Sequence, residues 1–441
     1  MRKYETYKDS GIEWIGEIPS HWEVLNLRKR PFNFEVGKRE QTDLKEVVSI
    51  GGEHIQEERF FLENLKYVSL EFFETAKNGK IRKDDILLVK DGATIGKAMF
   101  VDRLPFEKMM LNEHVYKIEA NKFFYYIIQS PETQYQFWMN NQSSAQESIT
   151  SDTLKSFVFC WPNEKEQTAI AAYLDRKTAE IDELIADKKR LLELYEEEKT
   201  AIINQAVTKG INPDAPMKDS GIEWLGEIPE HWEVKRLKMV VSKIGSGVTP
   251  SGGSTVYLTS GIPLLRSQNI HFGGLRLDDV AFISDEIDEG MSNSRIQDGD
   301  VLLNITGASI GRCYYVPHGF GKGNVNQHVC IIRPISEKID TIFLYYILRS
   351  EIGQTQIRLQ QIGANREGLN FEQLKNFGFP IPESIQEQQS IVHYIETECA
   401  LIDSKTEKTK KLIDLLTEYR TALISEVVTG KIKVTEGNGK I

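Results

Sequence analysis

The chain has 441 residues, of which 40% are hydrophobic and 27% charged, proportions that are ordinary for a globular protein of two to four domains. The N-terminus is polar, and no apolar run approaches the roughly 18 residues of a membrane span. We therefore expect a cytoplasmic protein that contacts no membrane. The four cysteines show no CxxC spacing, which argues against a zinc site or a disulfide framework and indicates buried free thiols.

The net charge of −11 at first argues against a nucleic-acid partner. The acidic excess, however, lies outside two large central blocks of the sequence. Residues 24–162 carry 19 basic and 20 acidic side chains, and residues 234–382 carry 15 and 13. The composition of these blocks is therefore compatible with a DNA-facing surface, although it does not by itself demonstrate one.

A tryptophan-rich peptide opens the chain and returns about half-way along it. KDSGIEWIGEIPSHWEV at 8–24 and KDSGIEWLGEIPEHWEV at 218–234 share 15 of 17 residues, and we call them the twin peptides. Further matching stretches follow in the same order: 81–101 with 296–316, 111–118 with 325–332, 123–130 with 343–350, and 154–162 with 374–382. The chain is therefore predicted to consist of two similar halves.

Each half is predicted to contain a block of mixed helices and strands. DDILLV at 84–89 and GDVLLNI at 299–305 are short apolar runs typical of strands, and a glycine-containing turn follows each of them. Helices are indicated by FFYYIIQS at 123–130 and FLYYILRS at 343–350. The halves diverge most between their matching stretches, at 36–80 and 244–295. We therefore expect one scaffold with divergent inserts that present two different recognition surfaces.

A long predicted helix follows each block, at 164–208 and 385–429. Neither stretch contains Gly or Pro, so each can form one helix of about 68 Å at 1.5 Å per residue. An apolar stripe indicates that each helix needs a partner along most of its length. The stripe residues are Leu174, Ile181, Leu184, Leu191 and Ile202 in the first helix and Ile395, Ile402, Leu412, Leu416 and Leu423 in the second. We predict an antiparallel coiled coil across a pseudo-twofold axis; the alternative is that each helix packs on its own block.

The sequence shows no recognisable catalytic or metal-binding motif. GATIGKA at 92–98 differs from a phosphate-binding loop, because only three residues separate its glycines and Ala98 replaces the hydroxyl that would hold magnesium. A turn between strands is the better interpretation. Asn112 with His114, and Asn326 with His328, lack the acidic neighbours of a metal site, which favours structural or DNA-contacting roles. These absences favour a binding protein.

Polar residues suited to the edges of DNA bases occur at equivalent places in the two blocks. Arg pairs well with guanine, and Asn or Gln with adenine, in a major groove. The candidates in the first block are Lys38, Arg39, Lys90, Thr94, Asn112, Gln142 and Gln146. Those in the second are Thr249, Arg266, Gln268, Asn269, Thr306, Ser309, Asn326, Asn365 and Arg366. For any one of them, a solvated loop position is the alternative.

The order of these features resembles a known family. Two variable blocks, each led by GEIPxHW and followed by a long helix that ends in KTAIINQAVTKG (199–210) or RTALISEVVTGK (420–431), resemble the specificity subunit of type I restriction-modification enzymes. The resemblance covers nearly the whole chain. It implies an α+β fold in which an antiparallel coiled coil of two long helices separates two pseudo-twofold-related mixed α/β target recognition domains.

The resemblance also implies an organisation along the chain. Target recognition domains with their leading GEIPxHW segments would occupy 1–162 and 211–382, spacer helices 163–210 and 383–431, and a flexible tail 432–441. The chain itself would be non-catalytic and would bind no cofactor or metal. It would read a two-part site in double-stranded DNA and recruit modification subunits, which bind S-adenosylmethionine and methylate adenine. Restriction subunits using ATP and Mg²⁺ would complete the assembly.

Two other functions fit the same sequence. The chain could be a protein-interaction scaffold that acts through its coiled coil, or an enzyme whose chemistry lies in the divergent inserts. The twin peptides are expected to anchor each block on the spacer. Their tryptophans, Trp14, Trp22, Trp224 and Trp232, are expected to bury against the helix ends or the block.

Overall fold

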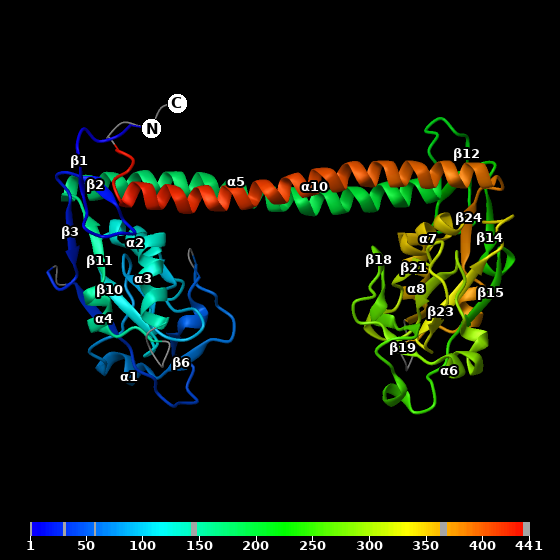
Figure 1. The fold of residues 1–441 in the computed structure, drawn as a ribbon, viewed down its shortest axis with the longest axis horizontal. Coiled ribbons are helices and arrows are strands. Elements are labelled where there is room, and N and C mark those ends of the chain that lie inside the picture. Colours follow the sequence, from blue (N-terminus) through cyan, green and yellow to red (C-terminus); the bar gives the residue numbers. More distant parts are fainter. Residues whose placement is uncertain (1, 30–31, 57–58, 143–147, 362–367, 435–441) are drawn as a thin grey trace. The chain divides into compact units, whose positions relative to one another are not determined.

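The computed structural model describes residues 2–29, 32–56, 59–142, 148–361 and 368–434. These residues form two compact units, drawn in Figure 1. The first unit combines Met1–Lys189 with Lys410–Ile441, and the second is Arg190–Thr409. Each unit therefore contains one block of the sequence together with segments of both long helices.

Two sheets form the block of the first unit. A four-stranded antiparallel sheet has the strand order β4-β10-β7-β8, and a three-stranded sheet has the order β6-β5-β9, in which β5 and β9 are parallel. Their bounds are β4 Asn33–Val36, β5 Val47–Ile50, β6 Lys66–Val68, β7 Ile86–Val89, β8 Ala98–Phe100, β9 Met109–Leu111 and β10 Val115–Glu119. Because β7 is fully buried, its four side chains are apolar, which confirms the predicted strand.

The second unit repeats both sheets. Its four-stranded sheet has the order β15-β23-β20-β21, and its three-stranded sheet the order β19-β16-β22, again with one parallel pair, β16 and β22. The bounds are β15 Val241–Ser246, β16 Ile262–Leu265, β19 Ala281–Ile283, β20 Val301–Asn304, β21 Cys313–Tyr315, β22 Asn324–Val325 and β23 Val329–Pro334. The most divergent stretches of sequence thus share one strand topology. Among the described residues, the second unit also has a small hairpin, β17 Ile270–His271 with β18 Gly274–Leu275.

Short helices complete each block. Those of the first unit are α1 Leu70–Thr75, α2 Lys122–Gln129, α3 Pro131–Gln142, α4 Ser151–Ser156 and the 3-10 turn η1 Gly52–His54. Those of the second are α6 Asp285–Gly290, α7 Thr341–Arg349, α8 Glu351–Gln361, α9 Phe371–Lys375 and the 3-10 turns η2 Leu237–Met239, η3 Gly253–Val256, η4 Ser267–Asn269, η5 Ser292–Ser294 and η6 Gly307–Ser309. The predicted helices at 123–130 and 343–350 are α2 and α7, and each joins the core that its block shares with the long helices.

The two long helices are α5, Glu164–Lys209, and α10, Ile385–Val428. Asn163 caps the start of α5 through its side-chain oxygen, and left-handed Gly210 and Gly430 follow the two helix ends. Asp182 pairs with Arg420 at 2.9 Å in the first unit, and Lys199 pairs with Asp403 at 2.7 Å in the second. Within the first unit, Asp182 on α5 meets Arg420 on α10, whereas Trp22 contacts both Glu166 near the start of α5 and Gly430 beyond the end of α10. The two helices are therefore antiparallel there, as predicted.

The apolar seam between the helices differs in part from the predicted stripe. Leu174, Ile181, Ile395, Ile402 and Leu423 are buried as expected. The remaining members Leu191, Ile202 and Leu416 are half-buried. The structure contradicts the other two, because Leu184 is 47% exposed and Leu412 is 41% exposed.

The spacing of the seam explains the error at Leu184. Beyond Leu174 the seam continues through Thr178, Ile181 and Ile185, so it alternates steps of four and three residues. A step of three from Ile181 leads to Leu184, whereas the seam takes a step of four to Ile185. Both choices are apolar, and only the position of the partner helix separates them.

Each twin peptide folds into a short antiparallel ribbon and a strand that pairs with the end of its block. The strands are β1 Tyr7–Asp9, β2 Glu17–Pro19, β3 Glu23–Asn26 and β11 Val158–Trp161 in the first unit. They are β12 Met217–Asp219, β13 Glu227–Pro229, β14 Glu233–Arg236 and β24 Gly378–Ile381 in the second. The peptide therefore returns to the point at which the block joins its long helix.

The four tryptophans of the twin peptides have two different environments. Trp22 and Trp232 are fully buried, and their indole N–H groups donate to Glu166 at 3.4 Å and Glu387 at 2.9 Å. Trp14 and Trp224 are 43% and 42% exposed, so the expectation that they are buried was wrong. They lie in the loop that joins the two strands of each ribbon, and the ring of Trp14 lies 5.5 Å from the ring of Tyr135, which is itself exposed.

Each buried tryptophan also contacts the end of the other long helix. Trp232 lies against Gly210 at the end of α5, and Trp22 lies against Gly430 at the end of α10. The backbone N–H of Lys433 donates to the carbonyl of Arg2 at 2.9 Å, so residues 432–434 of the predicted tail lie against the N-terminal segment. The rest of that tail lies outside the described residues.

The cysteines have the environment expected of inert thiols. Cys160, Cys313 and Cys330 are buried and Cys399 is half-buried, all as free thiols. Burial raises the pKa of the Cys160 thiol to about 12. None of the helices in the described part of the chain combines the length and the apolarity needed to cross a membrane.

Candidate nucleic-acid interface

Turns from three separate stretches of the first block, around Arg39, Asp91 and His114, converge at one edge of its sheets. The chain leaves β4 through Gly37, and a side chain at that position would overlap the carbonyl oxygen of Leu111. Gly247, after β15, stands in the same relation to Val325. Only glycine permits this close backbone approach. It brings Arg39 in one unit and Thr249 in the other beside the turn that contains the NxH motif.

The asparagines of the two NxH motifs shape this turn. Asn112 is buried, and its side-chain oxygen accepts a hydrogen bond from the backbone N–H of His114 at 2.9 Å. Asn326 is also buried and accepts from His328 at 3.1 Å. Both predicted DNA-binding asparagines are therefore engaged within the protein, and each holds the histidine two residues later in a fixed position.

His114 is the centre of a charged cluster in the first unit. Its Nδ1–H donates to Asp91 at 2.5 Å, and its Nε2 lies 3.4 Å from a carboxylate oxygen of Glu113. The same oxygen of Glu113 accepts from Nε of Arg39 at 2.8 Å. Lys90 pairs with the other oxygen of Asp91 at 3.0 Å. We call these five residues the first histidine cluster.

His328 is the centre of a neutral cluster with the same arrangement. An amide nitrogen can only donate, so the Gln327 amide donates to Nε2 of His328 at 2.9 Å, and Nδ1–H of His328 donates to the Thr306 hydroxyl at 2.6 Å. The hydroxyl of Thr249 donates to the side-chain oxygen of Gln327. We call these four residues the second histidine cluster.

The two clusters occupy equivalent positions of the repeat. Asp91 corresponds to Thr306, Glu113 to Gln327, and Arg39 to Thr249, so every position around the histidine differs in type. Beneath the first cluster, burial and then the Asp91 carboxylate raise the pKa of the Tyr116 phenol. The Tyr116 hydroxyl donates to the carbonyl of Ile149 at 3.1 Å. The backbone is thus shared, whereas the polar groups that it presents are not.

The turn after β16 contributes three more of the predicted residues. The guanidinium of Arg266 lies over the ring of Tyr257 at 5.6 Å and donates to the carbonyl of Asp279 at 2.9 Å. Gln268 donates to the carboxylate of Asp279 at 2.5 Å. Asn269 is buried and accepts from the backbone N–H of Arg266 at 2.9 Å, so it shapes the turn as the NxH asparagines do.

The remaining candidates lie on the same edge or outside the described residues. Lys38 and Thr94 are exposed, and Ser309 accepts from Asn304 at 3.1 Å. Gln146, Asn365, Arg366 and the side chain of Gln142 lie outside the described residues. Reasoning from the sequence noted His114 and His328 in the NxH motifs but did not select Asp91, Glu113 or Gln327. The available signal was a motif that recurs at one place in both halves while the residue inside it changes from Glu113 to Gln327.

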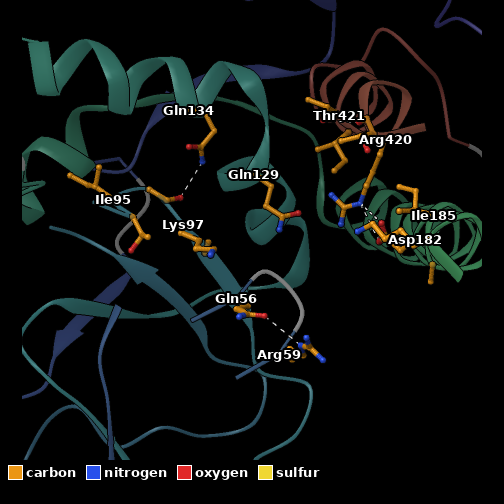
Figure 2. Close-up of a pocket in the computed structure, with 17 residues that line it drawn as sticks. Gln56, Arg59, Ile95, Lys97, Gln129, Gln134, Asp182, Ile185, Arg420 and Thr421 are labelled. Carbon is orange, nitrogen blue, oxygen red and sulfur yellow. Dashed lines mark hydrogen bonds and ion pairs between the residues drawn. The ribbon is translucent and has the colours of Figure 1, made fainter. Parts of the chain in front are cut away.

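A cavity of about 1060 Å³ lies beside this edge in the first unit, between the block and the helix pair (Figure 2). Gln56, Lys97 and Gln129 line it from the block, and Asp182 and Arg420 from the helices. Its charged lining consists of the cations Arg59, Lys97, Lys189 and Arg420 and the single carboxylate of Asp182. A cavity with this balance favours an anionic ligand.

Neither the cavity nor the clusters have the donor set of a metal centre. Within the ranges that the structure describes, no three His, Cys, Asp or Glu side chains are grouped so that they could hold a metal ion. The arrangement supplies hydrogen-bond donors and acceptors on turns, which is the chemistry of recognition.

Known proteins share this organisation. A family model described as the type I restriction modification DNA specificity domain matches residues 32–194 and 229–414. The chain belongs to this family of type I restriction-modification specificity subunits. Among curated relatives, this specificity subunit is 24% identical to the MjaVIII specificity subunit of Methanocaldococcus jannaschii, over 82% of the chain and 83% of the relative. It is 27% identical to the EcoBI specificity subunit of Escherichia coli, over 74% and 70%.

Solved structures share the fold of this specificity subunit. One chain, from work on complex assembly and conformational transition of the type I R-M system, superposes with a TM-score of 0.68 at 14% identity, covering 94% of this chain and 99% of its own. The HsdS subunit from Thermoanaerobacter tengcongensis gives a TM-score of 0.55 at 15% identity, with coverage of 94% and 98%. The predicted fold class and family are therefore confirmed.

Proposed function

We propose that this specificity subunit reads a two-part, non-palindromic DNA site, one part with each block. The supporting observation is the pair of histidine clusters, which have one backbone arrangement and different polar groups at every reading position. Two identical readers would select a palindrome. Two readers that differ in this way select unlike half-sites, and the helix pair between them sets the gap.

The chemistry is assigned to partner subunits. Modification subunits would bind S-adenosylmethionine and methylate adenine, and restriction subunits would use ATP and Mg²⁺, while this chain binds none of these. The two blocks are nearly neutral, so a large share of the phosphate affinity would come from the partners. The isolated chain is expected to bind DNA weakly and to gain affinity when modification subunits join.

The cationic cavity of the first unit would contribute backbone contacts. Arg59 and Lys97 lie beside the turn that contains Thr94, so a duplex held at the first histidine cluster would pass close to them. A phosphate there would meet several cations and one carboxylate, Asp182, that Arg420 already neutralises. Such contacts position the duplex and add no sequence preference.

Methylation sequencing of a host that expresses this chain with its modification subunits tests the proposal. We expect one two-part site with unlike halves and a fixed gap. Exchange of either block for that of a relative should change one half and leave the other intact. If the complex with its modification subunits protects no sequence selectively, the chain is a protein-interaction scaffold instead. Methyl transfer or cleavage by the purified chain alone would support the enzyme alternative.

A further inference from the structure

The two histidine clusters differ in the base edges that they suit. In the first, Nε of Arg39 is held by Glu113, which leaves both terminal nitrogens of the guanidinium unused by that contact. Glu113 is itself positioned by His114, and His114 by Asp91. The Arg39 side chain is 52% exposed. A guanidinium fork fixed from behind matches the two acceptors of guanine, O6 and N7.

In the second cluster the exposed group is the amide of Gln327. Its nitrogen gives one hydrogen to His328 and keeps a second, and its oxygen accepts from Thr249 and keeps a second lone pair. Both contacts approach the amide from the protein, and with Nε2 of His328 as the acceptor they orient it. The remaining donor and acceptor match N7 and the N6 amino group of adenine.

We propose that Arg39, backed by Glu113, reads a guanine in one half-site, and that Gln327, backed by Thr249 and His328, reads an adenine in the other. This inference rests on the proposed two-part reading. It assigns the base-reading contact of each block to one side chain of its histidine cluster. The buried asparagines Asn112 and Asn326 then only position the turn.

The experiment uses the complex of the full chain with its modification subunits, bound without S-adenosylmethionine to a duplex that carries its methylation site. Each guanine and adenine of the site is replaced in turn by its 7-deaza form, which removes the N7 acceptor and keeps Watson–Crick pairing. We expect wild-type affinity to fall about tenfold at one guanine of one half-site and at one adenine of the other.

The Arg39→Ala complex should lose its sensitivity to 7-deazaguanine at that position alone and keep its response in the other half-site. The Gln327→Ala complex should show the converse, with sensitivity lost at one adenine. Arg82→Ala and Gln297→Ala are matched controls. They are an exposed arginine and an exposed glutamine at equivalent positions of the repeat. Both come before a strand, β7 or β20, whereas the cluster residues Asp91 and Thr306 come after it. Both controls should respond as the wild type does.

Two results would overturn the inference: a variant that remains as sensitive as the wild type at every position, or a control that loses sensitivity equally. Because the affected residues are exposed, the variants should fold, and unchanged thermal unfolding midpoints check this. Arg39→Lys provides a second variant, since a lysine keeps the charge but has no fork and should not restore the sensitivity to 7-deazaguanine. If the wild-type complex has no two-part methylation site, the proposed function fails before this inference is tested.

Discussion

Asp182 and Arg420 form an ion pair that the chain contains twice. Their N–O distance is 2.9 Å, and the equivalent positions of the repeat, Asp403 and Lys199, pair at 2.7 Å. In the first pair the carboxylate lies on α5 and the cation on α10, whereas in the second pair the carboxylate lies on α10 and the cation on α5. This exchange follows from the repeat, because Asp182 is equivalent to Asp403 and Lys199 is equivalent to Arg420.

The first pair is more enclosed than the second, which predicts unequal contributions to stability. Asp182→Ala should lower the free energy of unfolding by about 1–2 kcal/mol, because it leaves the largely covered Arg420 without this carboxylate. Asp403→Ala should cost under about 1 kcal/mol, since its side chain is 58% exposed against 26% for Asp182. Urea unfolding measures both. Equal losses, or no recovery in Asp182→Arg with Arg420→Asp, would contradict this account.

The tryptophans of the twin peptides should separate into two classes on substitution. Trp22→Ala and Trp232→Ala each remove a fully buried ring and should lower the free energy of unfolding by about 3–5 kcal/mol. Trp14→Ala and Trp224→Ala should cost less than about 1 kcal/mol, because both side chains are exposed at the surface and fill no part of the core. Denaturant midpoints check the comparison, and a large loss for Trp14 would show that its ring has a structural role.

A change in helix length should alter the gap between half-sites and leave both half-sites intact. Four residues inserted after Lys188, with four inserted before Asp414 to keep the register, add about 6 Å and about 40° of net rotation. One base pair adds about 3.4 Å and about 35°, so the gap should grow by one or two base pairs. Methylation sequencing reads the result directly. An altered base within either half-site would refute the idea of a rigid spacer.

The cationic cavity should contribute affinity without sequence preference. Lys97→Ala should weaken DNA binding by the complex about equally on cognate and unrelated duplexes, and should reduce the slope of log affinity against log salt by about one. Lys375→Ala, an exposed lysine of α9 that pairs with Glu372, is a suitable control and should leave the slope unchanged. A loss confined to the cognate duplex would instead make Lys97 a base-reading residue.

The sequence predicted the elements that depend on local pattern and missed those that depend on a partner. The α5 and α10 helices followed from apolar spacing and from the absence of Gly and Pro. Leu184 and Leu412 were misassigned because the facing helix decides which of two neighbouring leucines or isoleucines is covered. The shared topology of 36–80 and 244–295 was not visible either, since strand pairing there needs only buried apolar residues such as Val48 and Leu264, whatever their identity.

In the candidate site too, the sequence indicated what local pattern determines and missed what depends on distant segments. Asn112, Asn269 and Asn326 were selected because their side chains suit base edges, yet each is buried and bonded within its own turn. Glu113 and Gln327, which lie between the asparagine and the histidine, were passed over. Residue type indicates what a side chain can bind, but the turn decides which side chain faces outward, and that depends on contacts with Asp91 or Thr306 from a distant strand.

Each compact unit contains segments of both long helices, so the first half of the chain alone would lack part of its own unit. A chain ending at Lys209 would leave the seam of α5 uncovered, and a second copy is the surface that fits it. In the antiparallel register seen here, Asp182 of one copy would meet Lys199 of the other, and this pair would form twice. Such a homodimer would present two identical histidine clusters, so its target would be a palindrome. On the proposed function, unlike half-sites would therefore arise from divergence of the cluster residues on one shared strand topology.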